Sequence, residues 1–244
     1  MITKYLILVL CFFATLTMHA QTVHHFNLWN KISVTQPINQ QFKTELDFQY
    51  RTQNNFFGDN TPFDEGLMRS LRLSVMYQFN KNITFNLSPY AYFSNNSIIV
   101  HQNDINKPVT HEVRFLAGVE IQSELSNRWF LLNKTGIEYR DFNQMPNSIR
   151  FRHKISLRYN FNDKFSALVY EEPLLNLTGT PKNHLFDHNR LALLGSFKPT
   201  KHWRFETGYI HINRLPRNSL STLEEEDIIF NLYYTLNSLK KHKS

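Results

Sequence analysis

The sequence predicts an all-β protein, a transmembrane antiparallel up-and-down β-barrel of about 10 to 12 strands. Three observations predict it. Apolar and polar residues alternate with a period of two from residue 26 onward, no long stretch carries a helical stripe, and several alternating runs reach about twelve residues. Strands in soluble sheets average about 5–6 residues, whereas a tilted strand needs roughly 9–11 residues to cross a bilayer. The length of the runs therefore favours a membrane barrel.

The segment 148–161 shows the two faces of such a strand. One alternate set is apolar at six of its seven positions, which are Ile149, Phe151, His153, Ile155, Leu157, Tyr159 and Phe161. The other set contains no carboxylate and includes Arg150, Arg152, Lys154 and Arg158. In a membrane barrel the apolar face meets lipid and the polar face lines the interior. We therefore expect these basic side chains to lie in the lumen.

The same alternation recurs along the chain and predicts eleven strands. Their ranges are 26–35, 41–53, 67–79, 83–94, 110–122, 129–141, 149–161, 165–172, 189–197, 202–213 and 227–236. Single-chain bacterial barrels have an even number of strands. We therefore expect one element to be misassigned. Either the first range is not a full strand, which leaves ten, or one strand has been missed, which gives twelve.

The links between these ranges alternate in length. Short links fall at 80–82, 123–128, 162–164 and 199–201, and longer links fall at 52–66, 95–109, 173–188 and 214–226. Asn and Asp in the short links suit tight turns because both residues tolerate left-handed backbone angles. Bacterial outer-membrane barrels have short periplasmic turns and long external loops. The short links are therefore expected on the periplasmic side.

The amino terminus has the features of a secretory signal peptide over residues 1–20. A single basic residue, Lys4, precedes an apolar run, and the small residue Ala20 precedes the expected cleavage point. A lipoprotein signal at Cys11, the only cysteine, is disfavoured by the bulky residue before it. Cleavage would leave 21–244 as one barrel domain with a short basic tail and no disulfide. The expected location is the cell outer membrane.

Charged residues gather on the predicted inner face near the outer mouth. Five consecutive strands contribute Glu112, Arg114, Glu138, Arg140, Arg150, Arg152, Glu172 and Arg190. Five arginines against three glutamates allow two interpretations. The charges could form ion pairs that fill a narrow lumen, or they could form a constriction that attracts anions. The sequence therefore predicts an outer-membrane barrel that is either structural or a narrow solute or anion pore.

Other constellations do not define a site. His184, Asp187 and His188 have side chains of the types that bind metals. Two histidines four residues apart can reach one metal ion from a helix, but these residues lie in a loop. Neighbouring residues of a strand point to opposite faces, so Glu171 and Glu172 cannot form a facing acid–base pair. Three serines, Ser156, Ser166 and Ser196, are expected in the lumen without a histidine in register. We therefore expect no enzyme, cofactor or metal.

Two alternatives remain open at this point. One is an outer-membrane lipid hydrolase or acyl-modifying enzyme, because a catalytic triad depends on spatial proximity that sequence does not show. The other is a soluble periplasmic β-barrel that binds an apolar ligand. The expected partners are outer-membrane lipids and the barrel-assembly machinery, which recognises terminal strands like 228–236. No nucleic-acid-binding module is present, and a monomer is expected.

Three short segments carry a resemblance to a known family. His111–Arg114 (HEVR), Tyr170–Leu177 (YEEPLLNL) and Phe186–Arg190 (FDHNR) resemble an uncharacterised family of bacterial outer-membrane barrels, a domain of unknown function. The resemblance covers nearly all of residues 21–237. It implies a signal peptide followed by one barrel and no established activity. It also implies that Glu172 and Arg190 form a characteristic polar pair.

Overall fold

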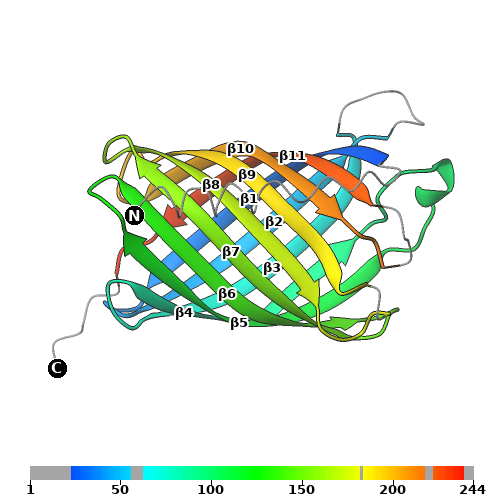
Figure 1. Ribbon diagram of the computed structural model, residues 1–244, viewed down its shortest axis with the longest axis horizontal. Helices are drawn as coiled ribbons and strands as arrows, with labels where there is room; N and C mark the ends of the chain where they lie inside the picture. The colour runs from blue at the N-terminus through cyan, green and yellow to red at the C-terminus, as the bar shows by residue number, and fades with distance from the viewer. Residues whose placement is uncertain (1–22, 56–62, 182–183, 218–221, 239–244) are drawn as a thin grey trace, which may run out of the picture.

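Eleven long strands follow one another around a closed barrel (Figure 1). The structure is a computed structural model that describes residues 23–55, 63–181, 184–217 and 222–238. Its strands are β1 (Val23–Pro37), β2 (Phe42–Gln53), β3 (Glu65–Gln78), β4 (Ile83–Asn95), β5 (Thr110–Glu124), β6 (Trp129–Phe142), β7 (Ser148–Asn160), β8 (Phe165–Asn176), β9 (Phe186–Phe197), β10 (Trp203–Arg214) and β11 (Leu223–Thr235). The predicted barrel is confirmed. The expected signal peptide and basic tail lie outside the described residues.

The closure of the barrel explains the odd number of strands. β1 pairs with β11 in parallel, from Val23 opposite Leu223 to Thr35 opposite Thr235. The other neighbouring pairs are antiparallel. The eleven predicted strands are therefore confirmed, and the expectation that one of them was misassigned was wrong, because a parallel seam allows a barrel to close with an odd number.

One end of the barrel carries five short turns, at 38–41, 79–82, 125–128, 161–164 and 198–202, and we call it the short-turn mouth. A side-chain oxygen near the start of each turn accepts hydrogen bonds from the backbone N–H groups two and three residues later. Asn39, Asn80, Ser126, Asn162 and Thr200 provide these oxygens. Such bonds replace backbone pairing and stabilise a tight reversal. The same local signal therefore sets all five turns.

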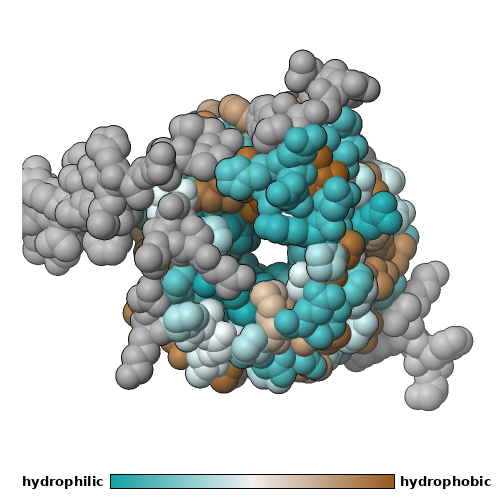
Figure 2. All heavy atoms as spheres, turned by 90° about the vertical axis from the view of Figure 1, so that its right-hand side faces the viewer, coloured by the Kyte–Doolittle hydropathy of each residue, from teal (hydrophilic) through white to brown (hydrophobic). Residues whose placement is uncertain are grey.

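The opposite end, which we call the long-loop mouth, carries the connections 54–64, 96–109, 143–147, 177–185 and 215–222. β1 also begins at this mouth, because Val23 pairs with the first residue of β11. Viewed from this side, the mouth is rimmed by hydrophilic residues and hollowed at its centre (Figure 2). The four links predicted to be long are confirmed as the longer connections, whereas 143–147 has five residues and is no longer than the short turn 198–202.

The strand predicted over 165–172 ends four residues later than the sequence predicts. β8 continues through Pro173 to Asn176, although the sequence places the end of this strand at residue 172. Proline has no N–H group to donate to a ladder. The recorded β7–β8 pairs pass from Ile155 opposite Glu171 to Arg152 opposite Leu174, so the ladder is interrupted at the proline. The strand tolerates Pro173 because the β7–β8 pairing is already broken there.

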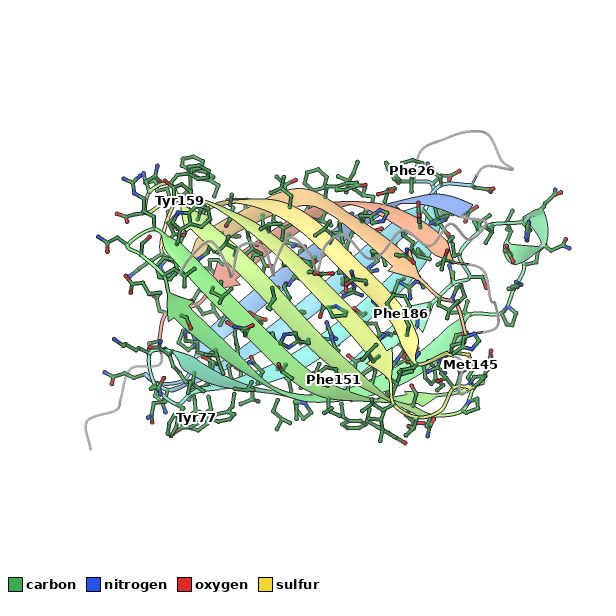
Figure 3. All side chains as sticks on the ribbon, in the orientation of Figure 1. Phe26, Tyr77, Met145, Phe151, Tyr159 and Phe186 are labelled. Atoms are coloured by element: carbon green, nitrogen blue, oxygen red, sulfur yellow. The ribbon has the colours of Figure 1, made fainter. Side chains whose placement is uncertain are left out.

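The outer wall of the barrel is apolar and carries aromatic rings at its short-turn end. Ring pairs with centroids 4.4–6.5 Å apart follow this edge, including Phe42–Tyr77, Trp129–Tyr159 and Trp203–Tyr234. Figure 3 places Tyr77 and Tyr159 at this end and Phe26 at the other. No helix in the described ranges is long and apolar enough to cross a membrane.

Candidate functional site in the barrel lumen

The eight charged residues predicted for the inner face form one connected network in the lumen. Glu138 lies at its centre and is 0% exposed. Its carboxylate accepts hydrogen bonds from Arg150 and from Nη1 of Arg152, the latter at 3.1 Å. Nη1 of Arg114 lies 3.8 Å from the same carboxylate. Glu138 therefore contacts three guanidinium groups, two of which come from the neighbouring strand β7.

The other two glutamates extend the network on either side. Glu112 accepts hydrogen bonds from Arg114 and from Nε of Arg140, the latter at 2.8 Å. Glu172 accepts from Nη2 of Arg152 at 2.6 Å and from Nη1 of Arg190 at 3.1 Å. The contact between Glu172 and Arg190 joins the two residues that the family resemblance pairs. We call the eight residues, together with Asp187 described next, the arginine–glutamate network.

Asp187 is a network member that strict alternation along the strand does not reveal. Its Oδ2 accepts a hydrogen bond from Nη1 of Arg150 at 2.5 Å. The β8–β9 register shifts between Leu174, opposite His188, and Leu175, opposite Phe186, so Asp187 is the extra residue of a β-bulge. The bulge buries both Asp187 and His188 on the inner side. With Asp187, four carboxylates face five guanidinium groups.

A second polar cluster lies at the seam between β1 and β11. Nδ2 of Asn27 donates to Glu225 at 3.1 Å and to Asp227 at 2.7 Å. Arg214 of β10 donates to Glu225. The acidic run at 224–227 is a visible signal in the sequence, but its inward members become a lumen site only when the seam is known. This cluster was not predicted.

Hollow space lies on both sides of the arginine–glutamate network. A central cavity of about 290 Å³ is lined by Arg152, Glu172 and Arg190. A second cavity of about 270 Å³, toward the long-loop mouth, is lined by Glu112 and Arg114 and also by Arg190. A third, of about 1020 Å³, opens at the short-turn mouth. The network therefore divides the central cavity from the cavity at the long-loop mouth.

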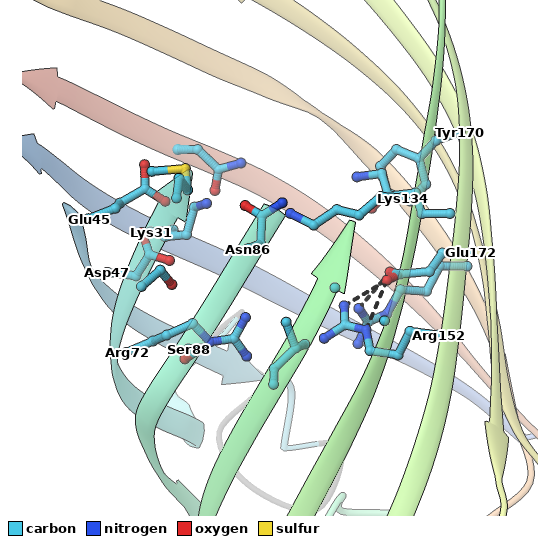
Figure 4. Close-up of a pocket in the computed structure, with 18 of the residues that line it drawn as sticks. Lys31, Glu45, Asp47, Arg72, Asn86, Ser88, Lys134, Arg152, Tyr170 and Glu172 are labelled. Atoms are coloured by element: carbon cyan, nitrogen blue, oxygen red, sulfur yellow. Dashed lines mark hydrogen bonds and ion pairs between the residues drawn. The ribbon is translucent and has the colours of Figure 1, made fainter. Parts of the chain in front are cut away.

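Some luminal cations have no carboxylate partner in the part of the chain that the structure describes. Arg72 of β3 reaches into the central cavity, and its closest aromatic contact is the Phe93 ring at 5.6 Å (Figure 4). Nζ of Lys154 lies 3.6 Å from the centroid of the Tyr170 ring. The guanidinium of Arg51 stacks on the Trp29 ring at 3.3 Å. These three side chains present positive charge to the lumen.

The remaining candidates separate in space. Glu172 points inward, whereas Glu171 points outward and accepts a hydrogen bond from Asn189 at 2.9 Å. Ser196 lies on β9 eight residues from the buried His188, which corresponds to about 26 Å along a strand. The luminal serine and histidine of this strand are therefore far apart. Within the described ranges, no three metal-ligating side chains are grouped to hold an ion.

The closed barrel and its charged lumen define the class of protein, a single-chain β-barrel whose long strands separate an apolar outside from an ionic interior. The chain belongs to the family described as "Protein of unknown function (DUF2490)", whose model matches residues 26–219. The predicted family resemblance is thereby confirmed.

A comparison with curated proteins finds no match. A solved structure that is similar to the chain is described as a "Bacterial polysaccharide outer membrane secretin". The two share 7% sequence identity with a TM-score of 0.47 over 80% of this chain. The chain spans 64% of that protein's length.

Proposed function

We propose that the protein spans the bacterial outer membrane and that its lumen is a narrow pore selective for small anions. The outer wall supports the membrane location. A closed barrel satisfies the backbone hydrogen bonds that lipid cannot satisfy, and an apolar wall with aromatic rings near its edge is typical of outer-membrane barrels. The short-turn mouth would face the periplasm, and the long-loop mouth would face the exterior.

The observation that carries the pore proposal is the net positive charge of the central cavity, whose lining holds six basic side chains and four carboxylates. Arg72 and Lys154 line the central cavity without a carboxylate partner in the described residues. A barrel that used its charges only as internal braces would pair them, because an unpaired buried charge is costly. Positive groups around a water-filled path attract anions. The arginine–glutamate network contains five arginines and four carboxylates, and this excess adds to the positive charge of the lumen.

Conductance across a planar lipid bilayer tests the proposal. Purified protein, with folding verified by heat-shifted gel mobility, should give small discrete current steps, and the reversal potential in a KCl gradient should show preference for chloride. Folded protein that gives no current would refute the pore. The charges would then be a structural plug.

Two arginine variants of the same strand provide a matched comparison. Arg72→Gln should reduce the chloride preference, because it removes a luminal charge without breaking an ion pair. Arg69→Gln removes a charge from the outward face of β3, where the guanidinium lies 5.5 Å from the Tyr50 ring. This control should leave the reversal potential unchanged. Equal effects of the two variants would contradict a luminal origin of the selectivity.

A further inference from the structure

The wall of the central cavity has an apolar side and a charged side. Its apolar side is built by the inward residues Trp29, Tyr170, Leu194, Ile210 and Ile229, from β1 and from β8 to β11. Four of these residues belong to one buried cluster, and Trp29 packs against it. The opposite side carries charged residues of both signs, namely Lys31, Arg72, Glu45 and Asp47 (Figure 4). A cavity with this division can contact both ends of an amphipathic molecule.

The pattern of β10 shows that the apolar side is a departure from ordinary barrel chemistry. Inward positions of an outer-membrane barrel are polar and outward positions are apolar. In the second half of β10 this order is reversed, because Ile210 and Ile212 point inward and are 2% and 0% exposed. His211 points outward, where its ring contacts Glu226. The sequence therefore places isoleucines in the lumen at the expense of the usual alternation.

Two glycines help to keep the cavity empty. Gly118 of β5 and Gly136 of β6 line the cavity and lie opposite each other. A Cβ atom added to Gly118 would lie 2.7 Å from the backbone oxygen of Thr135, so a side chain at this position requires the strands to shift. This part of the wall therefore contributes no side chain to fill the space.

The unpaired cations lie next to the apolar side. The ammonium group of Lys154 sits over Tyr170, at the border between the two sides, with Nζ 3.6 Å from the ring centroid. Arg72 has no hydrogen bond or ion pair to the described part of the chain and extends into the cavity. A guanidinium group presents planar, paired donors that match a carboxylate. An anionic head group could therefore contact Arg72 while an apolar body lies against the isoleucines.

We propose that the central cavity binds small organic anions that combine a carboxylate with an aromatic or short aliphatic body. The carboxylate would contact Arg72 and Lys154, and the body would lie against Tyr170, Ile210 and Ile229. The volume of about 290 Å³ is just below the roughly 300–1,000 Å³ of ligand sites, which fits a small, single-ring compound. The inference rests on the proposed pore and gives it a substrate class.

Tryptophan fluorescence can report binding at this position. Trp29 lines the cavity, whereas the other two tryptophans, Trp129 and Trp203, are exposed on the outer wall. A Trp129→Phe/Trp203→Phe variant therefore leaves one indole beside the proposed site. The bromine of 4-bromobenzoate should quench it in a saturable manner. Neutral 4-bromobenzamide and inorganic bromide should each require at least about tenfold higher concentration, because each lacks one of the two contacts.

Variants in this background test each side of the cavity. Arg72→Gln should weaken 4-bromobenzoate binding about tenfold, as expected for the loss of one charge-assisted contact. Ile229→Thr should weaken it about fourfold, the equivalent of one buried CH₂ group. Arg158→Gln is the matched control, because Arg158 lines the cavity at the short-turn mouth, where it donates to the neutral Gln122 and lies 4.8 Å from the Phe130 ring. The control should bind 4-bromobenzoate like the parent.

The outcomes separate this inference from the pore itself when conductance is measured on the same preparation. Current steps without saturable quenching, or equal quenching by bromide and 4-bromobenzoate, would overturn the organic-anion site and leave the pore. An equal loss in Arg72→Gln and Arg158→Gln would also overturn it. A third outcome is saturable quenching that Arg72→Gln abolishes, in a protein that gives no current steps. This result would support the binding site and refute the pore.

Discussion

Glu138→Gln is expected to destabilise the barrel by about 3 kcal/mol. Removing one partner of a buried ion pair costs roughly 3–5 kcal/mol, because the remaining charge stays buried without compensation. For Glu138 we use the lower end of this range of costs. Arg114 keeps Glu112, Arg150 keeps Asp187 at 2.5 Å, and Arg152 keeps Glu172 at 2.6 Å. Each guanidinium group that contacts Glu138 therefore retains another carboxylate.

Urea unfolding of the protein in phospholipid vesicles, followed by tryptophan fluorescence, measures this loss. Urea is uncharged and leaves the ion pairs unscreened. With a slope of about 2 kcal/mol per molar urea, a loss of about 3 kcal/mol shifts the midpoint by about 1.5 M. The double variant Glu138→Gln/Arg152→Gln should lose less than the sum of the single variants. Arg150 would still pair with Asp187, and Glu172 would still pair with Arg190.

A second luminal glutamate provides the control. Glu120 of β5 also points inward, but its ion pair with Lys134 is 3.7 Å long and the side chains are 34% and 45% exposed. Exposed pairs contribute about 0–1 kcal/mol. Glu120→Gln should therefore shift the midpoint little. If Glu138→Gln shifts it no more than Glu120→Gln does, the reasoning that the network is tightly coupled would be refuted.

Two further predictions concern the outer wall and a loop. Leu193 occupies an outward position of β9 and is 61% exposed, so Leu193→Arg should lower the free energy of unfolding in lipid vesicles by about 2–4 kcal/mol. The control is Leu125→Arg, in a short turn and 58% exposed, which should lower it by under about 0.5 kcal/mol. Equal losses would contradict a lipid-facing wall. Burial opposes ionisation of Asp104, but hydrogen bonds from Lys107 and from two backbone N–H groups lower its pKa below the ordinary aspartate value. Its stabilisation of the loop 96–109 should be complete above about pH 4 and should fall as the pH drops through the lowered pKa. Asp104→Asn should accelerate proteolysis of this loop at pH 7, and an unchanged rate would show that the contacts do not order it.

The fold could be predicted because a barrel wall repeats one simple constraint. An apolar outer wall and an ionic interior impose a period of two on every strand, and a single hydrogen-bonding side chain marks each short turn. The inward position of Glu138 follows from the same alternation. Its partners also follow, because neighbouring strands in a barrel are neighbours in sequence.

The unpredicted parts of the site are places where this constraint is broken or where distant segments meet. Asp187 faces inward only because a bulge adds a residue to β9. Asn27 and Glu225 are 198 residues apart, and their contact depends on a parallel seam that no local pattern encodes. Ile210 looks like an outward-facing residue in sequence, because the outer face of the barrel is the apolar one. The proposed binding cavity is thus built from residues that depart from the pattern used to predict the fold.

The parallel pairing of β1 with β11 gives the chain an unusual sidedness. β1 starts at the long-loop mouth and β11 ends at the short-turn mouth. A tag fused just ahead of β1 and a tag fused just after β11 would therefore stand at opposite mouths. In the proposed orientation the first would be accessible to antibody on intact cells and the second would be hidden in the periplasm, whereas an even-stranded barrel would keep both on one side.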